Sequence, residues 1–113
     1  MTNYSVGHDA EDVAADYLVN QSYKIIDTNW RTKYCEIDII AEKDGTIYFT
    51  EVKYRKSSVY GSGLDYITPK KLKQMKFAGE MWVSKNNWSG DYQLAAIELT
   101  GPAFQITNFL TIT

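Results

Sequence analysis

The chain has 113 residues, of which 44% are hydrophobic and 23% are charged. This length fits one domain, residues 1–113, and the composition excludes a disordered or collagen-like protein. The only cysteine, Cys35, excludes an internal disulfide, and together with the only histidine, His8, it excludes a zinc site built from these residue types. No apolar segment is long enough to span a bilayer, and no secretion signal is recognisable, so we expect a cytoplasmic protein without membrane segments.

Charge is distributed unevenly along the chain. The formal net charge is −2, yet residues 53–76 contain seven basic residues and one acid, a local charge of +6. The rest of the chain therefore carries −8. A basic segment of this kind favours a polyanionic partner, although a solvated helix face would have the same composition.

The first half of the chain predicts one helix and three strands. Apolar residues recur with helical spacing over residues 6–20, and segments 23–27 and 30–42 have the composition of strands. Asp44-Gly45 supplies the positive φ angles of a tight turn, so residues 46–53 should pair antiparallel with the preceding strand. The helical stripe consists of Ala10, Val13, Ala14, Tyr17 and Leu18.

The second half predicts a loop, a helix and two strands. Residues 54–67 are rich in serine and glycine and have no regular period, which is typical of a loop. Thr68 and Pro69 suit the N-cap and the first position of a helix that continues to about Ser84. Two further strands are predicted, over residues 92–99 and 104–110. The order of elements predicts an α/β fold with a mixed β-sheet core flanked by α-helices.

Acidic residues occur inside the predicted strands, where they are normally depleted. Because side chains alternate along a strand, Glu36 and Asp38 should share one face and Glu51 and Lys53 another common face. The same alternation predicts that Ile37, Ile39 and Ala41 lie together on the opposite face of their strand. Neighbouring strands are about 4.8 Å apart, so Asp38 and Glu51 are predicted to come close enough to share a divalent cation.

Magnesium prefers oxygen ligands and retains several waters, so Asp38, Glu51 and the carbonyl of Val52 would suffice to hold Mg²⁺ or Mn²⁺. Lys53 could then orient a water molecule or stabilise charge on a phosphate, and Glu11 could add a further carboxylate. The alternative interpretation is structural: Glu51 and Lys53 form a surface ion pair, and the acids of the preceding strand face solvent.

At these positions the sequence resembles the YraN-type predicted endonucleases, a family of the PD-(D/E)xK restriction-endonuclease-like superfamily. The similarity covers nearly the whole chain and is most specific in segments 36–41, 49–55 and 68–71. It implies a metal-binding nuclease of restriction-endonuclease-like fold more than it implies a particular substrate. The residues that match the family's site are Glu11, Asp38, Glu51, Lys53 and Lys71, while the role of Glu36 is left open.

The basic segment supplies candidate contacts to nucleic acid. Phosphate contacts are predicted for Arg55, Lys56, Lys70, Lys71, Lys73 and Lys76. Three interleaved tyrosines could stack on unpaired bases, namely Tyr54, Tyr60 and Tyr66.

The leading hypothesis is a metal-dependent endonuclease that hydrolyses phosphodiester bonds in DNA, including branched or single-stranded DNA in repair or recombination. The alternatives are a nucleic-acid-binding module of the same fold without turnover and a protein-interaction partner. A homodimer is expected only for a junction substrate, which needs two active sites.

Overall fold

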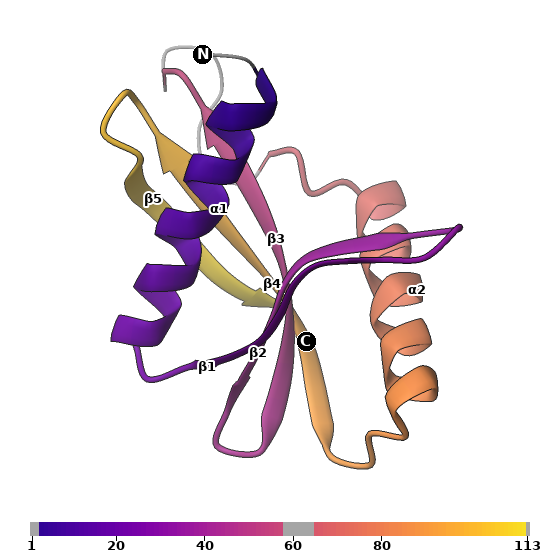
Figure 1. Ribbon diagram of the computed structural model, residues 1–113. Helices are drawn as coiled ribbons and strands as arrows, with labels where there is room; N and C mark the ends of the chain where they lie inside the picture. Colours follow the sequence, from indigo (N-terminus) through magenta and orange to yellow (C-terminus); the bar gives the residue numbers. More distant parts are fainter. Residues whose placement is uncertain (1–2, 58–64, 113) are drawn as a thin grey trace.

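One five-stranded sheet organises the fold (Figure 1). The computed structural model describes residues 3–57 and 65–112, with the backbone alone for residues 3–8. The elements in chain order are α1 (Asn3–Asn20), β1 (Lys24–Arg31), β2 (Glu36–Lys43), β3 (Thr46–Arg55), α2 (Pro69–Asn86), β4 (Asp91–Thr100) and β5 (Gln105–Ile112). The strand order is β1-β2-β3-β4-β5, with β3 and β4 parallel and the other neighbours antiparallel. The predicted α/β class is confirmed, and the sheet is consistent with a restriction-endonuclease-like core.

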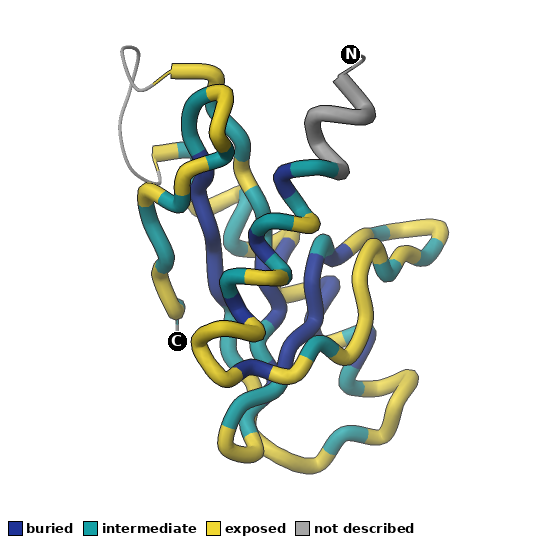
Figure 2. The backbone as a smooth tube through the Cα atoms, turned by 60° about the vertical axis from the view of Figure 1, so that its left-hand side comes forward, coloured by how far each residue is buried: buried dark blue, intermediate teal, exposed yellow. Residues whose placement is uncertain are grey.

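The two helices cover opposite faces of the sheet (Figure 1). Parallel neighbours need a crossover connection, and α2 provides it between β3 and β4. The core beneath α1 contains Ala10, Ala14, Leu18, Tyr23, Ile39, Ala41, Ile97 and Leu99. The core beneath α2 contains Ile37, Ile40, Ile47, Phe49, Ala78 and Trp82. Burial is concentrated in the central strands and in the inner side of α1 (Figure 2). Neither helix of the described chain has the length and apolarity to cross a membrane.

Local signals in the sequence set two of the element boundaries. Asp44 and Gly45 have φ angles of 52° and 80°, the conformation that a tight antiparallel hairpin requires between β2 and β3. Thr68 caps α2 because its side-chain oxygen accepts a hydrogen bond from the backbone N–H of Lys71 at 3.1 Å, and Pro69 follows as the first helical residue. The predicted turn and the predicted helix start are both confirmed.

The predicted continuous strand over residues 30–42 is wrong. Residues 30 and 31 end β1, residues 32–35 turn the chain, and β2 begins at Glu36. The backbone N–H of Thr32 donates to the carbonyl of Cys35 at 2.8 Å, which closes the turn without glycine or proline. The β1–β2 hairpin that results bends out of the sheet toward α2 (Figure 1). This turn is therefore able to border a pocket on α2.

Replacement of Gly79 by alanine is expected to destabilise the protein by about 1–3 kcal/mol, although alanine is the better helix former. An added Cβ would lie 2.7 Å from Cδ2 of Phe49, and Phe49 is buried with its ring 5.6 Å from that of Trp82. Urea unfolding of Gly79→Ala measures the effect, with Glu80→Ala, an exposed position of the same helix, as the control. Equal stability of both variants would contradict this packing.

Candidate functional site

The candidate site lies where β2 separates from β3. Pairing between the two strands ends at Ile39 and Thr50, one residue short of Asp38. The carboxylate of Asp38 continues the contact instead, because its Oδ2 accepts a hydrogen bond from the backbone N–H of Val52 at 2.8 Å. The side chain of Asp38 is thereby held against β3.

The same separation changes the face on which Ile37 lies. Ile37 packs beneath α2 together with Ile40, whereas Ile39 and Ala41 belong to the core beneath α1. The prediction that Ile37 shares a face with Ile39 and Ala41 is therefore wrong. The alternation of side chains between the two faces of the sheet fails here because β2 bends away from β3 (Figure 1).

The charges of three other carboxylates act on Asp38. Burial and, after it, the negative charges of Glu51, Glu11 and Glu36 raise the pKa of Asp38 to about 7, against the opposing hydrogen bond from Val52. Like charges this close disfavour one another's ionised forms.

Glu11 approaches this cluster from α1. Its Oε2 atom is buried and has no hydrogen-bond partner among the described residues. A buried carboxylate oxygen without a donor is costly, so its presence calls for a bound cation, a water molecule or a proton. Glu11 is thus a predicted site residue with an oxygen that is free to bind a further group.

Glu51 connects the sheet to the second helix. Its Oε1 atom lies 2.9 Å from Nζ of Lys71, and both side chains are partly buried. This ion pair joins β3 to the first turn of α2. Lys71 was predicted as a phosphate contact, and the structure places its ammonium on one of the two predicted metal-binding acids.

Lys53 lies over the ring of Tyr66 and forms no ion pair with Asp38 or Glu51 in the described chain. Its Nζ atom is 5.6 Å from the ring centroid, and the guanidinium carbon of Arg55 is 5.9 Å from the same centroid. Burial raises the pKa of the Tyr66 hydroxyl, and the charges of Glu51, Glu98 and Asp38 raise it further. The hydroxyl of Tyr66 is therefore within electrostatic range of the predicted acids Glu51 and Asp38, and its ring contacts the predicted lysine.

The donor set fits a hard divalent cation. In the described part of the chain no three side chains of histidine, cysteine, aspartate or glutamate are close enough to form a chelating group by themselves. Two carboxylates from β2 and β3, with water and substrate oxygens, are nevertheless a sufficient donor set for Mg²⁺. The raised pKa of Asp38 and the unpartnered oxygen of Glu11 are the two features that a cation would relieve.

The predicted phosphate contacts differ in their availability. Lys56, Lys70 and Lys73 are exposed, whereas Nε of Arg55 lies 2.8 Å from the buried carboxylate of Glu98. Lys76 borders a separate pocket beside β4 and β5. Contact of these residues with nucleic acid stays a prediction.

The tyrosines predicted to stack on bases have other neighbours in the structure. The ring of Tyr54 packs on Phe104 with centroids 5.1 Å apart, and its hydroxyl donates to the carbonyl of Gly101 at 3.1 Å. The hydroxyl of Tyr66 is buried and has no hydrogen-bond partner in the described residues. Tyr60 lies outside the described residues.

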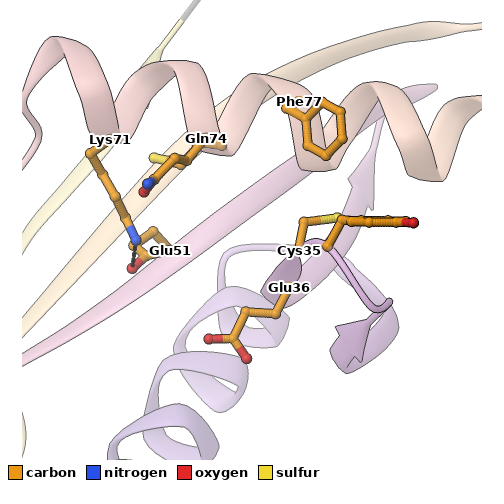
Figure 3. Close-up of a pocket in the computed structure, with 8 residues that line it drawn as sticks. Cys35, Glu36, Glu51, Lys71, Gln74 and Phe77 are labelled. Atoms are coloured by element: carbon orange, nitrogen blue, oxygen red, sulfur yellow. Dashed lines mark ion pairs between the residues drawn. The ribbon is translucent and has the colours of Figure 1, made fainter.

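A pocket of about 250 Å³ adjoins the ion pair of Glu51 and Lys71. Figure 3 shows this pair at one end of the pocket and Phe77 with Cys35 at the other. Its walls come from α2, from β3 and from the β1–β2 turn, which places Tyr34 in the lining.

Comparison with known proteins identifies the family. The model of the uncharacterised protein family UPF0102 matches residues 10–104. The chain belongs to this family. A UPF0102 protein of Sulfurihydrogenibium sp. (strain YO3AOP1) is 41% identical over 104 residues, which cover 90% of each chain. A UPF0102 protein of Tropheryma whipplei (strain Twist) is 37% identical over 120 residues, covering 99% of this chain and 96% of the relative. One from Vibrio parahaemolyticus is 34% identical over 96 residues, covering 83% and 79%.

Membership of UPF0102 confirms the resemblance to the YraN-type family. All of the predicted acids and lysines lie inside the segment that the UPF0102 model matches. Sequence reasoning missed five residues of the pocket lining, namely Tyr34, Cys35, Gln74, Met75 and Phe77. The only signal in the sequence was the presence of aromatic residues beside polar ones, which cannot be assigned to a surface without the packing of the turn on α2.

Proposed function

We propose that this UPF0102 protein is a metal-dependent phosphodiesterase that cleaves DNA. The observation that carries the proposal is that Asp38 is held against β3 by the N–H of Val52, at the point where β2 leaves β3, and that the charges of Glu51, Glu11 and Glu36 all act on it. Acidic side chains that lie near one another, one of them with an unpartnered oxygen, destabilise a fold but suit the binding of a cation. The lysines of α2 and the preceding segment provide positive charge for the DNA backbone.

In the proposed site Asp38 and Glu51 would hold Mg²⁺ or Mn²⁺, with the Val52 carbonyl as the predicted third ligand. The bound metal would supply a water of lowered pKa and charge for the phosphate that is cut. The N–H of Val52 fixes Asp38 in position, and the unpartnered oxygen of Glu11 is suited to accept a proton of a water molecule.

Two lysines would handle the phosphate. Lys71 reaches the site from the first turn of α2, where its ammonium lies on Glu51, and a phosphate oxygen could replace that partner. Lys53 is exposed and lies on the π-face of Tyr66, so its ammonium can turn toward an incoming phosphate without breaking an ion pair.

Asp38→Asn is expected to reduce cleavage by about 100-fold or more, since loss of even a supporting partner of a metal ligand costs about 10- to 100-fold. The measurement is cleavage of branched, single-stranded and duplex DNA with Mg²⁺ or Mn²⁺. Asp12→Asn is the control, because Asp12 is exposed on α1 next to Glu11. Cleavage by Asp38→Asn at the rate of the wild type would contradict the assignment of the site.

A nucleic-acid-binding module without turnover is the second candidate function. The position of Lys53 over Tyr66 and not beside the acids favours it. This alternative predicts DNA binding that weakens steeply with salt, is indifferent to EDTA and is never followed by cleavage.

A further inference from the structure

The pocket on α2 is continuous with the proposed catalytic acids. Glu51 and Lys71 form one end of its lining, so a phosphate held there would place the attached nucleotide at the pocket mouth. Figure 3 shows Lys71, Gln74 and Phe77 at successive positions along α2, with Glu36 on the opposite wall. Of the residues that line this pocket, the proposed reaction uses Glu51 and Lys71, and Glu36 enters it only through its charge.

Two exposed aromatic side chains line the far end of the pocket. Tyr34 is 71% exposed and comes from the β1–β2 turn, whereas Phe77 is 48% exposed and comes from α2. Large aromatic residues exposed together on two elements are unusual away from binding surfaces. Every nucleobase has a π-face, so aromatic side chains of this kind hold unpaired bases with little regard to sequence.

The polar lining suits the edge of a base. The amide of Gln74 offers both a donor and an acceptor, and the carboxylate of Glu36 offers acceptors for exocyclic amino groups. Both acids of the lining have cationic neighbours, Glu36 with Arg31 at 3.5 Å and Glu51 with Lys71 at 2.9 Å. A nucleotide phosphate in this pocket would therefore lie near carboxylates whose negative charge is already balanced by a neighbouring cation.

We propose that this pocket binds one unpaired base of a DNA strand whose backbone lies at Glu51 and Lys71. The substrate class is DNA with an unpaired nucleotide beside the bond that is cut. The volume of about 250 Å³ is below the range of about 300–1,000 Å³ that is typical of small-molecule pockets, which suits a single base. A base within a duplex is stacked and paired and cannot enter such a pocket unless it is flipped out. This inference rests on the proposed function, because the phosphate position comes from the catalytic acids.

The test is equilibrium binding, measured by fluorescence anisotropy with EDTA present so that no metal-dependent cleavage occurs. The probes are a labelled single-stranded oligonucleotide and a sugar–phosphate strand of the same length that lacks bases. The wild type is expected to bind the strand with bases about five-fold or more tightly, because stacking of one base on an aromatic side chain has about this effect or a larger one. Phe77→Ala and Tyr34→Ala should each reduce this preference, and Tyr92→Ala, an exposed aromatic outside the pocket, should retain it.

Several results would overturn the inference. These are equal binding of both strands by the wild type, absence of binding to either strand, or an unchanged preference in both Phe77→Ala and Tyr34→Ala. Binding of a free deoxynucleoside monophosphate as tightly as the strand would also overturn it, since the occupant would then be a free nucleotide. A base preference without cleavage in the presence of any metal would contradict the proposed reaction and support base binding in the pocket. Cleavage without a base preference would support the proposed reaction and contradict base binding in the pocket.

Discussion

At pH 8 and without divalent cations, Asp38→Asn should be more stable to unfolding than the wild type by about 2–4 kcal/mol. Burial and then the charge of Glu51 raise the pKa of Asp38 from its ordinary 3.8 to about 7. One pKa unit corresponds to about 1.4 kcal/mol, so the raised pKa destabilises the ionised folded protein by at most about 4 kcal/mol. Partial exposure of Asp38 to solvent reduces this value. Asparagine keeps an oxygen for the N–H of Val52 and removes the charge.

The size of this effect depends on pH in a defined way. Because the pKa of Asp38 is higher in the folded protein than in the unfolded chain, ionisation of Asp38 disfavours folding. The favourable contribution of the protonated carboxyl is complete below about pH 4 and is lost as the pH rises through about 7. The advantage of Asp38→Asn should therefore be small at pH 4 and reach its full size at pH 8.

Urea unfolding at pH 4, 6 and 8 measures the difference, with Asp12→Asn as an exposed control. Addition of Mg²⁺ should stabilise the wild type at pH 8 and leave Asp38→Asn unchanged, since a ligand that binds only the folded state stabilises it. A difference between the two proteins that is the same at every pH would contradict the electrostatic cause.

Arg55→Met is expected to destabilise the protein by about 3–5 kcal/mol at pH 7, because it leaves a buried carboxylate without its cation. Glu98 is only 3% exposed and accepts hydrogen bonds from Arg55 at 2.8 Å, Thr107 at 2.9 Å and Asn108 at 2.8 Å. Burial alone would raise the pKa of Glu98, but hydrogen bonds from Asn108, Thr107 and Arg55 outweigh it and lower this pKa. In the wild type the contribution of this lowered pKa is present at neutral pH and lost as the pH falls through the folded value.

Two comparisons make this second prediction specific. Glu98→Gln added to Arg55→Met should recover part of the lost stability, because the buried charge is then absent. Lys56→Met, at an exposed neighbouring position, should have little effect. The deficit of Arg55→Met should shrink in acid as Glu98 becomes protonated. A deficit below about 1 kcal/mol would show that this pair behaves like a surface ion pair.

Much of the fold was predictable because local signals and tertiary structure agree. Asp44-Gly45 fixes one hairpin and Thr68-Pro69 starts the second helix, and both are short-range effects of backbone conformation and capping. The boundary between β1 and β2 was not predictable in this way. Residues 30–42 have strand-forming types throughout, and the turn at residues 32–35 is closed by a backbone hydrogen bond that leaves no mark in composition.

The candidate site was also predictable only where it depends on neighbouring segments of the chain. Asp38 and Glu51 were placed near each other by strand alternation and hairpin pairing, which are properties of adjacent segments. The positions of Lys53 and Lys71 depend on Tyr66 and on the docking of α2, which are distant in sequence. The pocket was missed for the same reason, because its lining joins a β-turn to a helix that follows much later in the chain.

The parallel pairing of β3 with β4 also has a consequence for the order of folding. The β2–β3 and β4–β5 hairpins join neighbouring segments, whereas the β3–β4 ladder can form only after the chain from Arg55 to Asp91 has crossed over. Closing that long connection is entropically costly and slow compared with hairpin formation. Asp38 and Glu51 should therefore meet early, on a nascent hairpin, and Lys71 should reach them only in a late assembly step.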